Sequence, residues 1–137
     1  MKHVFDDDPD GVSSYAKETQ CGHSPAGTSL RSLNHFRQIM LAKKFQKYDF
    51  GAEENSLRYG TAEAPEYDLS RVQDVNLAML CGTKDKLVSP GDYLWLRDQL
   101  GANVKFFKEY PLGHLGLQMP ANKDHFADIA QVLADFC

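Results

Sequence analysis

The pattern of apolar and polar residues predicts two strands with a helix between them in the second half of the chain. Residues 76–81 and 104–110 have the length and the residue types of β-strands. A helix is expected over 91–100, with Ser89 as its N-cap and Pro90 in its first turn. Strands that are joined by a helix are expected to lie parallel in one sheet.

Two further helices are expected over 30–43 and 123–136, where apolar residues recur at helical spacing. Thr28 or Ser29 is a suitable N-cap for the first of them. The stripe of the last helix is Phe126, Ile129, Ala130, Leu133 and Phe136, and that of the first is Leu30, Leu33, Met40 and Leu41. Residues 45–74 show no sustained period. A connection of that length is expected to be functional, or to lie over a surface that this chain does not contain.

The predicted sheet is too small to be complete. Parallel sheets are normally covered on both faces and contain more than two strands. A pair of strands would leave unpaired edges, which favour aggregation. We therefore expect an α/β fold with an incomplete sheet, whose other strands precede residue 1 in sequence.

Composition indicates a soluble globular protein, because 42% of the 137 residues are hydrophobic and 25% are charged. A net charge of -4 gives no basic surface for nucleic acid, so no nucleic-acid partner is expected. No apolar run approaches the roughly 18 to 20 residues of a transmembrane helix. The first residues lack the apolar core of a signal peptide. The acidic segment 1–21 is expected to be disordered, and 22–137 to form the folded part.

Cysteine usage does not decide the compartment. Cys21, Cys81 and Cys137 are an odd number without CxxC spacing. Cys81 falls in a predicted buried strand, where a packed thiol is expected.

The candidate chemistry lies in the loops that follow the two predicted strands. Asp85 follows the first strand and His114 follows the second. Loops at the carboxyl ends of neighbouring parallel strands can bring such side chains together. Acid and histidine in this order end the Ser…Asp…His triad of the α/β-hydrolase fold. No Gly-x-Ser-x-Gly elbow stands upstream, so no nucleophile is assigned in this chain.

Two blocks around the first predicted helix resemble the acid lipases, the family of gastric and lysosomal acid lipase. The block His23–Ser29 (HSPAGTS) precedes the helix, and the block Phe45–Gly51 (FQKYDFG) follows it. A Gly-x-x-Asp turn at Gly82–Asp85 and a histidine loop at Gly113–Leu115 come later in the same order. The resemblance covers about residues 22–137, and it implies the C-terminal part of an α/β-hydrolase.

The resemblance implies that Asp85 is the triad acid and His114 the general base. It implies neutral lipid esters, either triacylglycerols or sterol esters, as substrates, and a secreted or lysosomal location. It implies no cofactor and no metal. An acidic residue and an aromatic one usually follow the histidine in this family, whereas Gly116 and Leu117 stand here.

Other residues compete for the same roles. Asp92 falls in the first turn of a predicted helix, where a carboxylate favours the helix dipole, so a structural role is expected. His125 is interpreted as a surface or capping histidine in the last helix. Ser24 stands in GHSPA, which begins like a nucleophile elbow but lacks the second glycine and a preceding strand. Pro25 also restricts Ser24 to extended conformations, so a nucleophilic role is not expected.

Metal binding is not favoured either. Asp6, Asp8, Asp10 and Gly11 match the first half of a calcium loop, but Lys17 occupies the place of the bidentate acid. The remaining histidines, His3, His23 and His35, show no zinc-ligand spacing. The aromatic residues of 45–67 are expected to cover the core rather than to line an acyl pocket.

Two functions remain open. The first is the C-terminal part of an acid-lipase-like serine esterase, inactive alone and dependent on an N-terminal hydrolase half. The second is a non-catalytic hydrolase remnant that serves as a structural or interaction subunit of a larger assembly. The retained acid and histidine loops favour the first function, whereas the missing N-terminal half and the altered residues after His114 favour the second.

Overall fold

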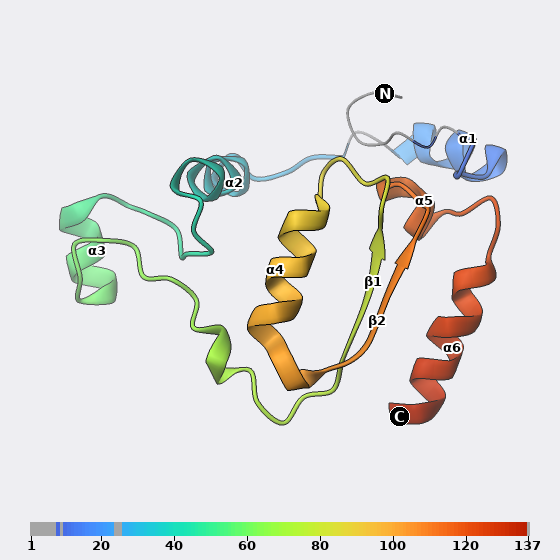
Figure 1. The fold of residues 1–137 in the computed structure, drawn as a ribbon. Helices are drawn as coiled ribbons and strands as arrows, with labels where there is room; N and C mark the ends of the chain where they lie inside the picture. Colours follow the sequence, from blue (N-terminus) through green and yellow to red (C-terminus); the bar gives the residue numbers. More distant parts are fainter. Residues whose placement is uncertain (1–7, 9, 24–25, 137) are drawn as a thin grey trace. The chain divides into compact units, whose positions relative to one another are not determined.

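The computed structural model describes residues 8, 10–23 and 26–136. The chain divides into two compact units. One unit combines the N-terminal segment up to residue 24 with 70–137, and the other comprises 25–69. Figure 1 gives the element labels that are used below. Each unit is described by itself.

The larger unit contains a parallel pair of strands, β1 (Leu77–Gly82) and β2 (Val104–Tyr110). The pairing runs from Leu77 opposite Val104 to Gly82 opposite Tyr110, with one irregularity after Leu77. The helix α4 (Pro90–Leu100) and the short helix η2 (Gly101–Asn103) connect the strands. The predicted parallel strand pair is therefore confirmed, within a mixed helix and strand fold.

The start of α4 follows from its sequence. The Asp92 carboxylate accepts hydrogen bonds from the Ser89 backbone N–H at 3.0 Å and from the Ser89 hydroxyl at 2.7 Å. Together with Pro90 in the first turn, this capping box explains why the helix begins at this residue. The expected structural role of Asp92 is confirmed.

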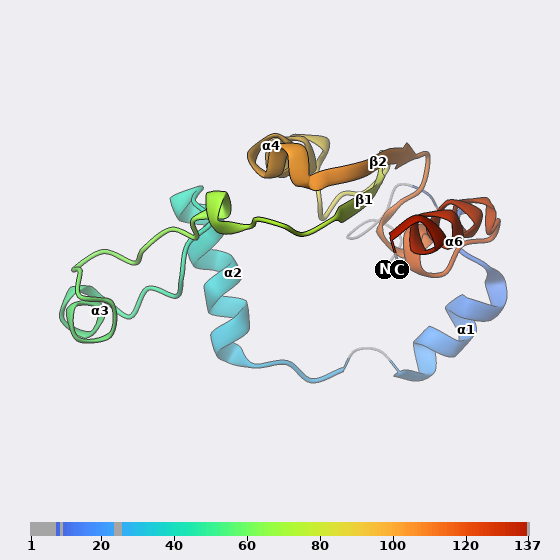
Figure 2. The same cartoon turned by 90° about the horizontal axis from the view of Figure 1, so that it is seen from below.

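The two faces of β2 pack against different helices. Phe107 and Glu109 face Tyr93 of α4, whose hydroxyl donates to Glu109 at 2.6 Å. Lys108 and Tyr110 alternate with them and contact the other flanking helix, α6 (Asp124–Phe136), where both donate to Asp128. Side chains alternate along a strand, so α4 and α6 lie on opposite sides of the two strands (Figures 1 and 2).

These contacts change the ionisation of the groups between the strands and helices. The hydrogen bonds from Lys108 and Tyr110 hold the pKa of Asp128 below its usual value. Burial raises the pKa of the Cys81 thiol on β1, and the charge of Glu109 adds to this effect. Cys81 is buried, so the expected packed thiol is confirmed.

The apolar stripe of α6 is not the part of the helix that is buried. Phe126, Leu133 and Phe136 are each at least 40% exposed, whereas His125 is only 3% exposed. The interpretation of His125 as a surface or capping histidine is therefore wrong. The helix turns this imidazole towards Tyr110, whose ring centre lies 5.5 Å away.

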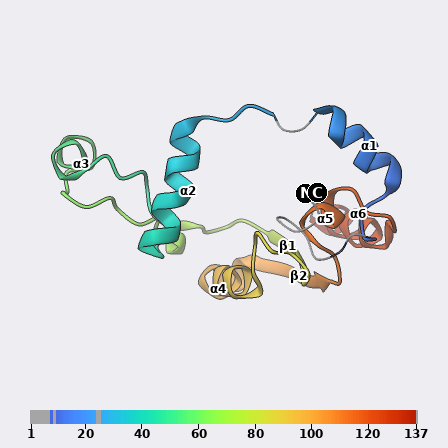
Figure 3. The same cartoon turned by 90° about the horizontal axis from the view of Figure 1, so that it is seen from above.

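The N-terminal segment contains a helix that its sequence pattern does not predict. α1 spans Ser14–His23, so most of it lies in the segment 1–21, for which the sequence predicts disorder, and its end lies in 22–137. The Ser13 hydroxyl accepts a hydrogen bond from the Ala16 N–H at 3.1 Å and so caps the first turn. Figure 3 shows α1 on the side of the strands where α5 (His114–Gln118) and α6 lie.

The smaller unit begins with α2 (Leu30–Ala42), close to the expected 30–43. Ser29 is its N-cap and accepts from the Arg31 N–H at 3.2 Å, so of the two candidate caps the structure has Ser29. Lys43, with φ 52°, ends the helix in the left-handed region. The apolar side chains Leu30, Leu33, Met40 and Leu41 are 54–81% exposed, so no described residue buries this face.

A second helix in this unit, α3 (Ala52–Tyr59), lies where no periodic pattern was found. Fully buried Asn55 holds its start, because the amide donates to Asp49 at 2.7 Å and to the Ala62 carbonyl at 3.0 Å. Hydrogen bonds from Gly51 and Asn55 lower the pKa of Asp49. A 3₁₀ turn, η1 (Leu69–Arg71), follows. Nowhere in the described ranges is a helix long and apolar enough to cross a membrane.

Candidate active site

The loop that carries Asp85 continues the sheet beyond the end of β1. The Thr83 N–H donates to the Tyr110 carbonyl at 2.9 Å, and the Lys84 N–H donates to the Leu112 carbonyl at 3.1 Å. The Asp85 N–H then turns back to the Gly82 carbonyl at 3.3 Å. These backbone bonds join the Asp85 loop to the segment that leads from β2 to His114.

The first residue of this turn has to be glycine. A Cβ on Gly82 would overlap the carbonyl oxygen of Leu112 and would also crowd the Leu117 side chain. The two loops therefore approach each other more closely than any other residue at position 82 allows. This close approach gives a physical reason for the Gly-x-x-Asp turn.

His114 is the first residue of α5 and follows the N-cap Gly113. The Leu117 N–H donates to the Gly113 carbonyl at 3.1 Å, and the Met119 N–H donates to the Leu115 carbonyl at 2.8 Å. One helical turn thus sets the direction of the imidazole at the carboxyl end of β2.

Asp85 and His114 form a direct pair. Asp85 Oδ2 lies 2.9 Å from His114 Nδ1. Asp85 Oδ1 accepts from the Leu87 N–H at 2.8 Å and from the Val88 N–H at 3.0 Å. The Asp85 side chain is 5% exposed, whereas that of His114 is 31% exposed. Two backbone donors fix the carboxylate, which in turn orients a partly accessible ring.

This geometry determines which ring nitrogen is available for proton transfer. A carboxylate opposite Nδ1 favours the tautomer that carries its proton there. The Nε2 lone pair is then free to accept a proton, and among the described residues the hydrogen bond of the His114 ring is the one at Nδ1. An imidazole held in this way can act as a general base, and the carboxylate can stabilise the imidazolium that forms.

His125 packs against the histidine loop and supports it, a role that the sequence pattern does not indicate. Its Nε2 lies 3.1 Å from the carbonyl oxygen of Leu117, near the end of α5. The ring packs between Tyr110 and Phe126, whose ring centres lie 5.5 and 4.6 Å away. No local pattern marks this burial, because it depends on how α6 packs against the histidine loop.

Among the other sequence candidates, only those in the described part of the chain can be placed relative to this pair. Ser24, Asp6 and His3 lie outside the described residues. His23 is exposed at the end of α1. Asp8 of the calcium-like motif forms an ion pair with Lys84 at 3.2 Å. Over the described ranges, no three His, Cys, Asp or Glu side chains are grouped as metal ligands would be.

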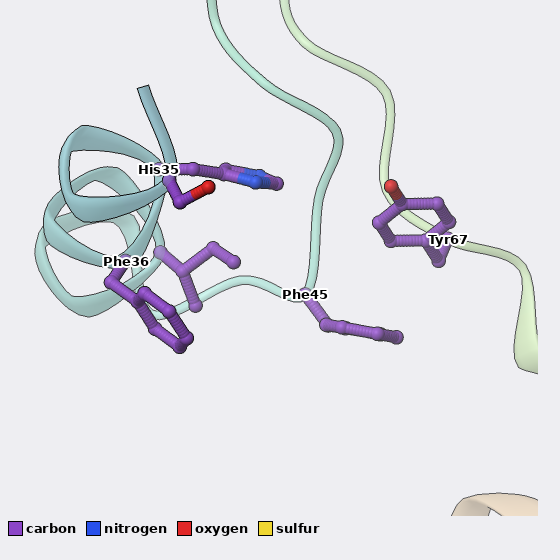
Figure 4. A pocket seen from close by; sticks show the side chains of 6 residues that line it. His35, Phe36, Phe45 and Tyr67 are labelled. Atoms are coloured by element: carbon purple, nitrogen blue, oxygen red, sulfur yellow. The ribbon is translucent and has the colours of Figure 1, made fainter. Parts of the chain in front are cut away.

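An apolar cavity of about 350 Å³ lies in the smaller unit, where Phe36 and His35 of α2 face Phe45 and Tyr67 (Figure 4). His35 is held by its Nε2, 2.9 Å from the Gln46 carbonyl oxygen. The rings of Phe45 and Tyr67 lie 4.8 Å apart and line the cavity. Its lining comes entirely from residues 32–67, so it includes neither Asp85 nor His114.

Comparison with known proteins identifies relatives of this chain, although no family model matches it. Human gastric triacylglycerol lipase is 32% identical over 117 residues, which are 82% of this chain and 29% of that protein. The mouse gastric triacylglycerol lipase is 34% identical over 118 residues, again 29% of that protein. Mouse lipase member N is 34% identical over 90 residues, 65% of this chain and 22% of that protein.

The matched segment amounts to less than a third of the length of these relatives. Several lipases align with most of this chain at similar levels of identity, which is the relationship that the lipase-like blocks around α2 predict. The chain is therefore related to the acid lipases, the family of gastric triacylglycerol lipase.

Proposed function

We propose that residues 22–137 are the C-terminal part of an α/β-hydrolase domain, and that they supply the acid and the histidine of a serine ester hydrolase. The observation that carries this proposal is the contact of 2.9 Å between Asp85 Oδ2 and His114 Nδ1. The two backbone donors on Asp85 Oδ1 support it, because they prevent the carboxylate from turning away.

The proposed mechanism assigns each nitrogen of His114 a task. Nε2 takes the proton of a serine hydroxyl as the serine oxygen attacks the ester carbonyl. The same proton is then given to the leaving alcohol, and the acyl group stays on the serine until water removes it. Asp85 keeps the proton on Nδ1 and stabilises the positive ring.

The nucleophilic serine comes from outside this chain in this proposal, so the chain alone is inactive. Two observations support an N-terminal hydrolase portion beyond these 137 residues. The relatives are more than three times as long as the matched segment. The described sheet has only two strands, which leaves both of its edges unpaired. The missing portion would add strands to this sheet and bring its serine to Nε2.

The proposed substrates are neutral lipid esters. The name of gastric triacylglycerol lipase supports triacylglycerols as one class. The resemblance to lysosomal acid lipase adds sterol esters as the second class. A secreted or lysosomal location is part of the same proposal.

A second candidate function is that of a non-catalytic hydrolase remnant in a larger assembly. The exposed apolar face of α2 favours it, since Leu30 and Met40 are 81% and 75% exposed. Monomeric soluble proteins rarely expose large contiguous apolar patches, so this face is suited to contact another protein.

Fluorophosphonate labelling distinguishes the two functions. The recombinant chain and native material purified through it would be labelled and assayed with a triacylglycerol and a sterol ester. Labelling of a bound partner protein, or of a longer form of this chain, together with ester hydrolysis, would support the esterase function. Absence of labelling in material that still contains bound proteins would support the remnant.

His114→Ala tests the assignment of the base in the active material. We expect it to reduce hydrolysis by about a thousandfold or more, because the serine would lose its proton acceptor. His23→Ala is the matched control, because His23 is an exposed histidine in the same unit. Equal and small losses from both variants would contradict a catalytic role for His114.

A further inference from the structure

The N-terminal segment lies against both loops of the Asp85–His114 pair. We call its described residues, 8 and 10–13, the N-terminal strap. The Ala121 N–H donates to the Gly11 carbonyl at 2.9 Å, and the Ser13 N–H donates to the Met119 carbonyl at 3.1 Å. Between these bonds, Val12 pairs with Pro120 in an antiparallel bridge. The strap is thus attached immediately after α5, the helix that begins with His114.

The other end of the strap reaches the Asp85 loop. The Asp8 carboxylate lies 3.2 Å from Lys84 Nζ, and the Asp8 side chain is only 13% exposed. Lys84 precedes Asp85, and its own N–H donates to the Leu112 carbonyl. A partly buried ion pair at this point is screened by solvent less than one on the open surface. One short segment therefore holds both loops.

Gly116 of the histidine loop lies directly beside the strap. A Cβ at Gly116 would already touch the Gly11 carbonyl oxygen and Leu112 Cβ, each at 3.4 Å. These are ordinary van der Waals distances, so the loop and the strap are in direct contact at this point. Val12 is 6% exposed, so the strap is packed into the larger unit rather than laid over it.

We propose that the N-terminal strap is a positioning element that holds the Asp85 and His114 loops in their paired arrangement. Asp8, one residue of the acidic motif at the start of the chain, contributes to this positioning through its ion pair with Lys84. The inference rests on the proposed function only where it treats Asp85 and His114 as catalytic groups. The positioning itself can be measured without any activity.

Amide hydrogen exchange of the full chain, followed by NMR, tests this inference. The Leu87 and Val88 amides report on the Asp85 loop, because both donate to Asp85. The Leu117 and Met119 amides report on α5. Amides in the middle of α4 serve as the internal reference for global stability.

Lys84→Met removes the ion pair while keeping the aliphatic length of the side chain. We expect exchange at Leu87 and Val88 to become about two- to fivefold faster, with α4 unchanged. The double variant Asp8→Lys, Lys84→Asp exchanges the two charges and should restore most of the protection of the Leu87 and Val88 amides against exchange. Lys105→Met is the matched control, since Lys105 is exposed on β2 and its Nζ donates only to the Ala102 carbonyl at 2.7 Å.

Val12→Ala tests the other attachment point. It should make exchange at Leu117 and Met119 about tenfold faster, because a buried apolar contact of the strap is lost. The signal of the Nδ1-bound proton of His114 should broaden in the same variant. This proton reports the contact with Asp85 directly, because Nδ1 lies 2.9 Å from Asp85 Oδ2.

Each outcome bears on the inference. Faster exchange confined to the two loops, with rescue by the charge exchange, would support a positioning strap. Unchanged loops, or equal acceleration in α4, would overturn it. Fluorophosphonate labelling is an independent measurement. If the exchange data support the strap but no serine is labelled, the proposed esterase function would be rejected and the inference about the strap would stand.

Discussion

Gly82 and Leu112 approach each other so closely that no side chain fits between them. The carbonyl oxygen of Leu112 occupies the place that a Cβ on residue 82 would take, and it accepts the Lys84 N–H at 3.1 Å. This contact joins the ends of the two strands just before Asp85 and His114.

Gly82→Ala should therefore destabilise the protein. Because the opposing atom belongs to the backbone, the strand end has to move, at a cost of about 1–3 kcal/mol. Urea unfolding followed by circular dichroism would measure the free energy of unfolding. Gly27→Ala is the control, since a Cβ there meets nothing within 4 Å. Equal stability of both variants would contradict the close approach.

Asp85→Asn should preserve the fold and reduce ester hydrolysis by the complemented enzyme about a thousandfold or more. An amide can still accept the Leu87 and Val88 N–H groups, but it cannot hold the His114 tautomer as a carboxylate does. The rate constant kcat for a triacylglycerol would be measured. Asp92→Asn, which weakens only the cap of α4, should cost about 1 kcal/mol in stability and leave kcat almost unchanged.

His125→Ala should destabilise the protein by about 2–4 kcal/mol. The imidazole is 3% exposed, packs on Tyr110 and hydrogen-bonds to the Leu117 carbonyl oxygen, so its removal leaves a cavity below the histidine loop. Thermal and urea unfolding would measure the loss. Exposed His23→Ala should change the free energy of unfolding by less than about 0.5 kcal/mol. His125→Ala is consequently a poor control for His114→Ala.

Alkaline titration should weaken the contacts between β2 and its two helices. The hydrogen bond to Glu109 raises the pKa of Tyr93 from 10.0 to about 12. Burial, together with the bond to Asp128, raises the pKa of Tyr110 from 10.0 to about 12. Because the folded state holds both protons more tightly, their stabilising contribution is complete below pH 10 and is lost as the pH rises through about 12.

The free energy of unfolding should accordingly fall between these pH values, and Tyr93→Phe should make the fall less steep. Near-ultraviolet absorbance of the phenolate would follow the titration in the folded chain. Titration of Tyr93 and Tyr110 with midpoints near the ordinary pKa of 10.0 in the folded state would contradict the two hydrogen bonds.

Much of the larger unit can be predicted from the sequence because its signals are local. The strands, the capping box of Ser89 and Asp92, and the positions of Asp85 and His114 after the strands all depend on residues near one another in the chain. Parallel pairing then follows from the order of the elements, and it brings Asp85 and His114 to the same end of the sheet.

The smaller helix α3 shows where local signals are insufficient. Glu53, Glu54 and Arg58 suit the ends of its dipole, but eight residues give too few turns for an apolar period. The helix depends instead on Asn55, whose buried amide bonds to residues outside the helix.

The sequence by itself determined the two strands, the helices α2, α4 and α6, the order of acid and histidine, and the resemblance to acid lipases. Only the tertiary structure decided that His125 is buried, that Gly82 has no room for a side chain, and that the N-terminal strap, residues 8 and 10–13, contacts both loops. Period and capping depend on neighbouring residues, whereas burial and close approach depend on which distant segment packs against a given side chain.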